Sequence, residues 1–374
     1  MRLLFVSHES QVNGSTKSMA TLINSLKKLH NCKIDVLIPG EGAAERFLEE
    51  NKIRYRVMKY CSNFRKIGTN NKMKNHAREI INDIQMVRLM RIVRKNEYDY
   101  IISNSSAVDI AARVAYILKV KHIFYIREFM EEDFSFEYIN KNRMKQLIEN
   151  ADKVIFISNA IKEKYCNKYE IKNYRVIYNA IESKEYYQEE HKILYDNCLK
   201  FIQIGSLSDG KGTLDTLRYI NHLRKIVPCH ITFVGNVQEQ YFNKLDKYVT
   251  VNEMKEMVQF IPYTREIKKI LNSKDILIMN SHMEGFGRVT VEGMLNGLLV
   301  LGKETGGTTE IIKDNYNGLL FRDENDFIEK IIRVVENKDY YRKIALQGQD
   351  EAAERFSPKK NADDVWSYLN EISV

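Results

Sequence analysis

A nine-residue segment, GSLSDGKGT, has the residue types of a phosphate-binding turn. It runs from Gly205 to Thr213, directly after the apolar run 201–204 and at the start of a helical stretch. Free backbone N–H groups at the start of a helix, together with the ammonium of Lys211, favour a bound phosphate. Gly212 stands where a Walker loop requires Ser or Thr for magnesium, so the segment is not a Walker loop. We expect a diphosphate site that uses Lys211; the alternative is a purely structural turn.

A second glycine-bearing turn holds two carboxylates. Glu284 and Glu292 stand eight positions apart, with Gly285 and Gly287 between them, after the apolar strand 276–279. This spacing places Glu284 in a loop and Glu292 two turns into the following helix, and the glycines let backbone amides approach a ligand closely. The alternative is that Glu292 is a solvated helix residue and that Glu284 complements the helix dipole.

Further polar groups follow other strands. The turn 306–310, GGTTE, again leads from a strand into a helix, so three such turns in the second half should crowd one edge of a sheet. In the first half, Gly14 follows the strand 3–6 and Arg127 follows the strand 122–126. Either could be functional or simply part of a capped helix or a surface pair.

Several chemistries find no support in the sequence. No His, Asp and Glu spacing resembles a metal site, no Asp-x-Asp pair ends a strand, and no G-x-S-x-G elbow occurs. His8 and His122 are expected to be structural. The five cysteines lie far apart without a CxxC pair, which favours a reducing compartment over a disulfide framework or a zinc site.

The elements that must position these residues form two series. Length alone, 374 residues, indicates two domains. Short, almost continuously apolar runs alternate with helical stretches, which predicts parallel sheets covered by helices. The expected strands are 3–6, 34–38, 100–103, 122–126, 154–157 and 175–177, then 201–204, 231–234, 259–261, 276–279 and 298–301. We therefore expect an α/β fold of two Rossmann-like, doubly wound domains that face a central ligand-binding cleft.

The predicted domains are residues 1–184 and 185–357, joined by a polar segment. The helix expected at 358–374 contains Trp366 and has no following strand, so it could fold back onto the first domain.

Charge is divided unevenly between these halves. Residues 1–184 carry 33 basic and 21 acidic side chains, whereas residues 185–374 carry 25 and 29. Residues 51–96 alone hold 13 basic and 2 acidic side chains. Such a surplus of basic residues indicates contact with an anionic surface, either lipid or nucleic acid.

The segment 72–96 also has a helical apolar period. It is either an amphipathic helix on lipid or a core-facing helix with a solvated basic side.

Together these motifs resemble the family 4 retaining glycosyltransferases of the GT-B type, and in particular those that act on bacterial surface polysaccharides. The closest likeness is 275–321, DILIMNSHMEGFGRVTVEGMLNGLLVLGKETGGTTEIIKDNYNGLLF, with its E-x7-E spacing. Other stretches match in order: VIFISNAIKEKY from 154, VIYNAI from 176, IGSLSDGKG from 204 and ITFVGN from 231. The likeness covers most of the chain from residue 101 onward.

The resemblance implies that the domain 1–184 binds the acceptor and that the domain 185–357 binds the nucleotide-sugar donor. It also implies roles for individual residues. Lys211 would bind the donor diphosphate, Glu292 the ribose hydroxyls, and Glu284, with the loop residues that follow it, the transferred sugar. Those loop residues are Gly285, Phe286 and Gly287, and Gly14 would lie beside the donor phosphates. No metal or other cofactor is then expected, and transfer would retain the anomeric configuration by front-face attack.

Two positions depart from the family pattern. Ser206 stands where the family usually has an arginine, and Arg127 stands where many members have a catalytic-site histidine. The REF triplet 127–129 resembles the subset that acts on surface polysaccharides. Arg127 is therefore expected to supply the charge that Ser206 lacks.

The implied function is transfer of a sugar from a nucleotide-diphosphate sugar to a glycan or polyprenyl-linked acceptor, in synthesis of a bacterial surface polysaccharide such as a capsule. We expect a cytoplasmic protein, peripheral on the inner face of the membrane through residues 52–95, and no nucleic-acid partner. The alternatives are a nucleotide-sugar 2-epimerase of the same architecture and a non-enzymatic nucleic-acid-binding protein. No recognisable nucleic-acid-binding motif accompanies the basic segment.

Overall fold

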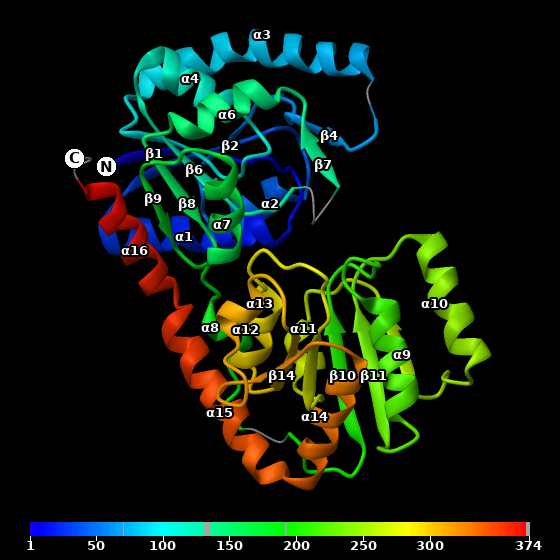
Figure 1. The fold of residues 1–374 in the computed structure, drawn as a ribbon. Coiled ribbons are helices and arrows are strands. Elements are labelled where there is room, and N and C mark those ends of the chain that lie inside the picture. Colours follow the sequence, from blue (N-terminus) through cyan, green and yellow to red (C-terminus); the bar gives the residue numbers. More distant parts are fainter. Residues whose placement is uncertain (70, 131–134, 191–192, 372–374) are drawn as a thin grey trace. The chain divides into compact units, whose positions relative to one another are not determined.

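The computed structural model describes residues 1–69, 71–130, 135–190 and 193–371. The chain forms two compact units: Met1–Ala180 with Pro358–Val374, here the amino-terminal unit, and Ile181–Ser357, here the carboxyl-terminal unit (Figure 1). The division lies after Ala180, four residues before the predicted boundary at 184. The backbone N–H of Ile181 donates to the carbonyl of Phe356, and the carbonyl of Tyr186 accepts from Asn296, which ties the segment after Ala180 to the second unit.

The amino-terminal unit contains a sheet of seven strands in the order β3-β2-β1-β5-β6-β8-β9, and every pair is parallel. Its central strands are almost fully buried, as expected of a sheet with helices on both faces. The strands are β1 Arg2–Val6, β2 Lys33–Ile38, β3 Tyr55–Val57, β5 Tyr100–Ser103, β6 Lys121–Ile126, β8 Lys153–Phe156 and β9 Tyr174–Val176.

The carboxyl-terminal unit contains a second parallel sheet, of six strands, in the order β12-β11-β10-β13-β14-β15. The strands are β10 Leu199–Ile204, β11 Cys229–Val234, β12 Val258–Ile261, β13 Ile276–Met279, β14 Leu299–Lys303 and β15 Leu319–Phe321. The predicted α/β class with two Rossmann-like doubly wound domains is thus confirmed.

Helices connect the strands of each sheet. In the amino-terminal unit they are α1 Gly14–His30, α2 Ala43–Glu50, α3 Lys72–Asn96, α4 Ile110–Leu118, α6 Lys141–Glu149, α7 Asn159–Lys168 and α16 Pro358–Asn370. In the carboxyl-terminal unit they are α8 Ser183–Tyr186, α9 Thr213–Leu223, α10 Glu239–Val251, α11 Ile267–Leu271, α12 Arg288–Leu295, α13 Thr308–Ile311, α14 Glu324–Glu336 and α15 Lys338–Arg355. Among the described helices, none is long and apolar enough to cross a membrane.

The carboxyl-terminal helix α16 packs on the amino-terminal unit, against α1. The rings of His30 and Trp366 stack at 4.8 Å, and Nε2 of His30 lies 2.9 Å from Oδ1 of Asp363. The buried ammonium of Lys153 donates to the carbonyl of Tyr368 and lies 4.5 Å from the centre of its ring. These contacts fix the last helix to the first domain although more than 170 residues of chain separate them.

A small antiparallel pair of strands, β4 Phe64–Lys66 and β7 Phe136–Tyr138, lies apart from the main sheet of the amino-terminal unit. Arg65 and Glu137 stand opposite each other in this pair, and their side chains form an ion pair of 3.0 Å. The pair joins the chain just before α3, the long helix on the outside of this unit, to the chain just before α6 (Figure 1).

Candidate functional site

The three glycine-bearing turns of the carboxyl-terminal unit meet at one edge of its sheet. They follow β10, β13 and β14, which are neighbours in the sheet. Gly212 directly precedes α9 and has a φ of +63°, and a Cβ placed there would lie 2.1 Å from the carbonyl oxygen of Asn280, after β13. The backbone N–H of His282 also donates to the carbonyl of Gly210, at 2.9 Å. Glycine at position 212 is therefore required both by its backbone conformation and by this close approach.

The turn after β14 packs on the turn after β13 in the same way. A Cβ at Gly306 would lie 2.6 Å from the carbonyl oxygen of Glu284, and one at Gly307 would lie 2.7 Å from that of Gly285. The backbone N–H of Gly307 donates to the carbonyl of Glu284, at 2.7 Å. The structure thus brings the three turns together as predicted. Backbone hydrogen bonds join the turn after β13 to the turn after β10 and to the turn after β14.

The side chains of Lys211 and Glu284 form the charged centre of this edge. Nζ of Lys211 lies 2.7 Å from Oε2 of Glu284, and the two side chains are 35% and 17% exposed. The carbonyl of Lys211 accepts from Nε2 of Gln203, which lies on β10 and holds the turn in place. An ammonium and a carboxylate, both oriented and both open to solvent, can bind an anionic group and a hydroxyl group side by side.

Glu292 lies on α12 and is only 7% exposed. Nη2 of Arg288 donates to its Oε1, at 3.3 Å. Burial, the negative charge of Glu292 and a hydrogen bond to it raise the pKa of Tyr186. Glu292 is therefore a positioned, largely desolvated carboxylate rather than the solvated helix residue of the alternative interpretation.

The other predicted residues of this unit differ in exposure. Phe286 is 3% exposed and its ring packs edge to face on Phe356, so its backbone rather than its side chain is available to a ligand. Gly285 is also buried. Gly287 directly precedes α12 and has a φ of +98°. Ser206 is exposed in the turn after β10.

The two remaining predicted residues, Gly14 and Arg127, belong to the amino-terminal unit. Gly14 is the exposed first residue of α1, after Asn13, whose side chain caps that helix. Arg127 follows β6 and is 8% exposed. Its guanidinium donates to the amide oxygens of Asn104 and Asn179, and its Cζ lies 4.0 Å from the centre of the Tyr125 ring. Two neutral acceptors and one aromatic ring thus hold this cation in a fixed orientation.

The next residue, Glu128, was not predicted as a site residue. Its Oε1 accepts three hydrogen bonds, from the hydroxyls of Ser105 and Ser106 and from the backbone N–H of Ser106. The run of polar residues at 104–106, directly after a strand, is the sequence signal that could have indicated this cluster.

The two histidines expected to be structural lie in the same unit. Burial lowers the pKa of His8 and lowers that of His122 to about 3, so both rings are neutral at pH 7. Nε2 of His122 lies 2.9 Å from Oγ of Ser103. Within the described parts of the chain, no three or more His, Cys, Asp or Glu side chains are grouped as metal ligands would be.

Two family models match the chain, one on each half. The model of glycosyl transferases group 1 matches residues 188–351, and the model of glycosyltransferase family 4 matches residues 12–185. Together they account for nearly the whole chain, and the first covers all three glycine-bearing turns.

Curated proteins with similar sequences carry related descriptions. An uncharacterized glycosyltransferase, MJ1178 of Methanocaldococcus jannaschii, is 27% identical over 61% of this chain and 62% of its own length. A trehalose synthase of Pyrococcus horikoshii is 24% identical over 46% of this chain and 43% of its own. The Escherichia coli UDP-Gal:alpha-D-GlcNAc-diphosphoundecaprenol alpha-1,3-galactosyltransferase is 23% identical, with 82% and 80% coverage. The chain therefore spans less than two thirds of the length of the first two of these relatives.

Solved structures match over the full length. Anabaena Alr3699/HepE, crystallised in complex with UDP, has a TM-score of 0.82 at 19% identity, with 100% of both chains covered. A mutant form of S. aureus TarM has a TM-score of 0.77 at 14% identity, with 99% of this chain and 100% of that chain covered. The likeness to these structures shows that the chain has the GT-B fold. The two family models show that the chain belongs to the family 4 glycosyltransferases.

Proposed function

We propose that this protein transfers a sugar, with retention of configuration, from a nucleotide-diphosphate sugar to a glycan or polyprenyl-linked acceptor in synthesis of a cell-surface polysaccharide. The observation that carries the proposal is the Lys211–Glu284 pair at the convergence of three glycine-bearing turns. An oriented cation beside helix starts suits a diphosphate, and the adjacent carboxylate suits sugar hydroxyls. The named activity of the E. coli relative and the UDP bound to the Anabaena protein support a UDP-sugar as the first donor to test.

In this proposal the leaving nucleoside diphosphate is stabilised by local charges. Lys211 and the N–H groups of the glycine turns bind the diphosphate, and each good donor contributes on the order of a few kcal/mol to the transition state. Glu292 accepts hydrogen bonds from the ribose. Glu284, with the backbone of Phe286 and Gly287, positions the transferred sugar rather than attacking it, and no metal ion takes part.

Arg127 and Gly14 complete the proposed set from the amino-terminal unit. Ser206 carries no charge, so Arg127 is proposed to supply the second cation for the donor phosphates, and Gly14 to lie beside them. Support comes from Asn104 and Asn179, whose amide oxygens accept hydrogen bonds from the guanidinium of Arg127 and orient it.

We also propose that the outer face of α3 rests on an anionic membrane surface. The side of this helix opposite its buried residues carries Met73, Ile80, Ile84 and Val87, which are 84%, 45%, 63% and 47% exposed. Exposed cations flank this apolar stripe, and residues 51–96 hold 13 basic and 2 acidic side chains. An apolar stripe between basic residues is typical of a helix that lies in a lipid interface.

Two assays test the proposal. A panel of nucleotide sugars is screened by thermal unfolding, because a ligand at 100 times its Kd adds about 2.7 kcal/mol to the free energy of unfolding. We expect a nucleotide-diphosphate sugar to stabilise the protein and nucleoside monophosphates to do so far less.

The fraction of protein that sediments with vesicles is expected to rise with the content of anionic lipid and to fall with salt. Insensitivity to both would contradict the membrane contact.

A further inference from the structure

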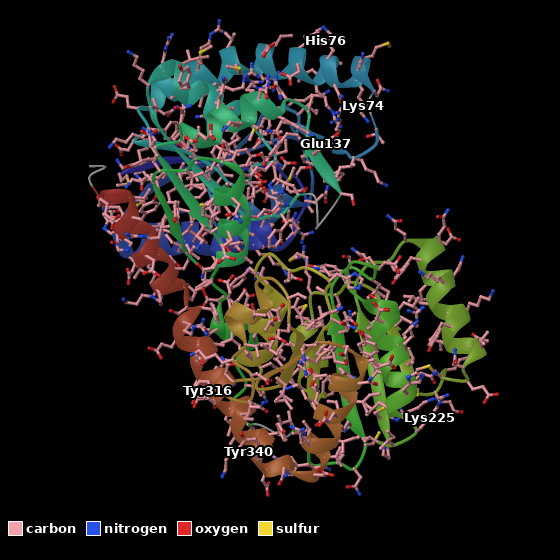
Figure 2. All side chains as sticks on the ribbon, viewed as in Figure 1. Lys74, His76, Glu137, Lys225, Tyr316 and Tyr340 are labelled. Carbon is pink, nitrogen blue, oxygen red and sulfur yellow. The ribbon has the colours of Figure 1, made fainter. Side chains whose placement is uncertain are left out.

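An open groove of about 400 Å³ lies between the first two turns of α3 and the start of α6. Lys72, His76 and Glu79 follow one another at spacings of four and three residues, so they share one face of α3. Arg143 comes from α6 and Arg65 from β4, so charged groups enter the groove from three elements. Figure 2 labels His76 on α3 and Glu137 on β7, the strand that pairs with β4.

The carboxylates in and beside this groove are already paired with arginines. Glu79 accepts two hydrogen bonds from Arg143, at 2.8 and 2.6 Å, and Arg143 also lies 2.7 Å from the buried Asp109. Glu137 pairs with Arg65 at 3.0 Å and with Lys141 at 2.6 Å. Both arginines are therefore held in fixed positions at the walls of the groove.

Lys72 and His76 differ from these arginines. Among the described residues, neither makes an ion pair or a side-chain hydrogen bond, and both are exposed. Of the groove's charged residues, Arg65, Lys72 and Arg143 are cationic and only Glu79 is anionic. Because Glu79, Asp109 and Glu137 already pair with the two arginines, Lys72 is the lining cation without an ion pair among the described residues. With the neighbouring His76 it offers donors to a small anion.

The groove borders the apolar stripe of α3. Lys72 faces the groove, and Met73, the next residue, begins the stripe that continues through Ile80 and Ile84. Successive residues of a helix point about 100° apart, so the groove and the stripe lie side by side along the same turns. A ligand that joins an anionic head to a hydrocarbon chain would place one part in each.

We infer that the α3–α6 groove binds the phosphate head group of a lipid, with a preference for a phosphomonoester or diphosphate over a phosphodiester. The inference rests on the proposed function, in which the acceptor is polyprenyl-linked, and it adds a site and a head-group chemistry to the general attraction of α3 for anionic lipid. A terminal phosphate offers three oxygens and up to two negative charges, so it can accept from several walls of the groove at once.

The test compares phosphatidylcholine vesicles containing either phosphatidic acid, a phosphomonoester, or phosphatidylglycerol, a phosphodiester, at matched zeta potential. Wild-type protein is expected to bind the phosphatidic acid vesicles about fivefold more tightly, the size of one additional basic contact at a membrane surface. The variant Lys72→Ala/His76→Ala is expected to lose this preference. The matched control Lys74→Ala removes an exposed cation of the same helix outside the groove, and should weaken both bindings equally.

Three results would overturn the inference. One is equal binding of wild-type protein to the two kinds of vesicle. Another is a preference that survives in the double variant, or that disappears equally in Lys74→Ala. The third is binding of inorganic pyrophosphate that the double variant abolishes, without any preference among vesicles, which would assign the groove to a soluble anion.

The proposed transferase function is tested separately on the same proteins. None of the residues proposed to bind the nucleotide sugar lines the α3–α6 groove, so the double variant is expected to bind the donor as wild-type protein does. Loss of the lipid preference in the double variant, with intact donor binding, supports the proposed lipid site in the groove. Absence of donor binding in the wild-type protein would refute the proposed function, whatever the vesicles show.

Discussion

The ion pair between Lys211 and Glu284 predicts opposite effects for two alanine substitutions. Lys211→Ala removes the ammonium proposed to bind the donor diphosphate. Glu284→Ala removes a carboxylate that lies 2.7 Å from that ammonium and competes with the diphosphate for it. Affinity for a free nucleoside diphosphate should therefore fall in the first variant, and stay equal or rise in the second.

The magnitudes follow from the geometry. A hydrogen bond to a charged group contributes about 1.5–3 kcal/mol, so Lys211→Ala should raise the Kd for the diphosphate about 10- to 150-fold. The two side chains of the pair are 35% and 17% exposed, so solvent screens their attraction. Releasing Lys211 should then gain only about 0.2–1 kcal/mol, a Kd up to about fivefold lower in Glu284→Ala. The same variant should lose most of the extra affinity for the nucleotide sugar over the nucleoside diphosphate.

Isothermal titration with UDP and with a UDP-sugar measures both effects. Lys225→Ala is the matched control, because this lysine follows the far end of α9 from the Lys211 turn (Figure 2). The reasoning is refuted if Lys211→Ala binds UDP as tightly as wild-type protein does. It is equally refuted if Glu284→Ala weakens UDP binding as much as Lys211→Ala does.

Four further substitutions test the site and the fold. Gly212→Ala should lower the free energy of unfolding by about 3 kcal/mol or more, from a left-handed backbone and a clash with a carbonyl 2.1 Å away. Gly210→Ala, with open space at its Cβ, should change it by less than about 0.5 kcal/mol, and equal effects in urea titrations would contradict this account. Arg127→Ala should lower turnover about 100- to 1,000-fold in a variant that still melts cooperatively, and undiminished turnover would exclude its proposed role. Burial lowers the pKa of His122 to about 3 from 6.5, so its contribution to stability is complete above pH 6.5 and is lost as the pH falls. Relative to His122→Asn, wild-type protein should lose about 1.4 kcal/mol per pH unit below that point, and parallel pH profiles would contradict the assignment.

Much of this architecture could be predicted because buried parallel strands leave continuous apolar runs in the sequence. Strands such as Tyr100–Ser103 and Ile276–Met279 were predicted with the bounds that the structure shows. Three-residue strands such as Tyr55–Val57 and Leu319–Phe321 were missed, because so short a run carries little pattern, although the equally short run 175–177 was predicted. These strands gain their place from hydrogen bonds to neighbouring strands rather than from local sequence.

Those parts of the candidate site that are formed by residues close together in the sequence could be predicted. The glycine turns and the E-x7-E spacing are contiguous in sequence, so Lys211 and Glu284 could be named in advance, although their direct contact spans 73 positions. The partners of Arg127 lie 23 and 52 positions away, and only the register of the sheet brings them together. The α3–α6 groove likewise depends on an ion pair between residues 64 positions apart.

The sequence left two interpretations of α3 open: an amphipathic helix that lies on lipid, or a core-facing helix with a solvated basic side. Sequence period alone could not separate a lipid-facing helix from a core-facing one, because apolar residues occur on both sides. The structure buries Met86, Leu89 and Val93 and exposes Ile80 and Ile84. Packing in the core does not account for the exposed apolar side chains of Ile80 and Ile84, and these side chains support the proposed membrane contact.

The most direct test of the central claim is release of nucleoside diphosphate from a panel of nucleotide-diphosphate sugars, with and without a lipid-linked glycan acceptor. The account predicts release that depends on the acceptor, a product with the donor's anomeric configuration, and loss of both in Lys211→Ala. Acceptor-independent release of an epimerised sugar, or a product of inverted configuration, would contradict it.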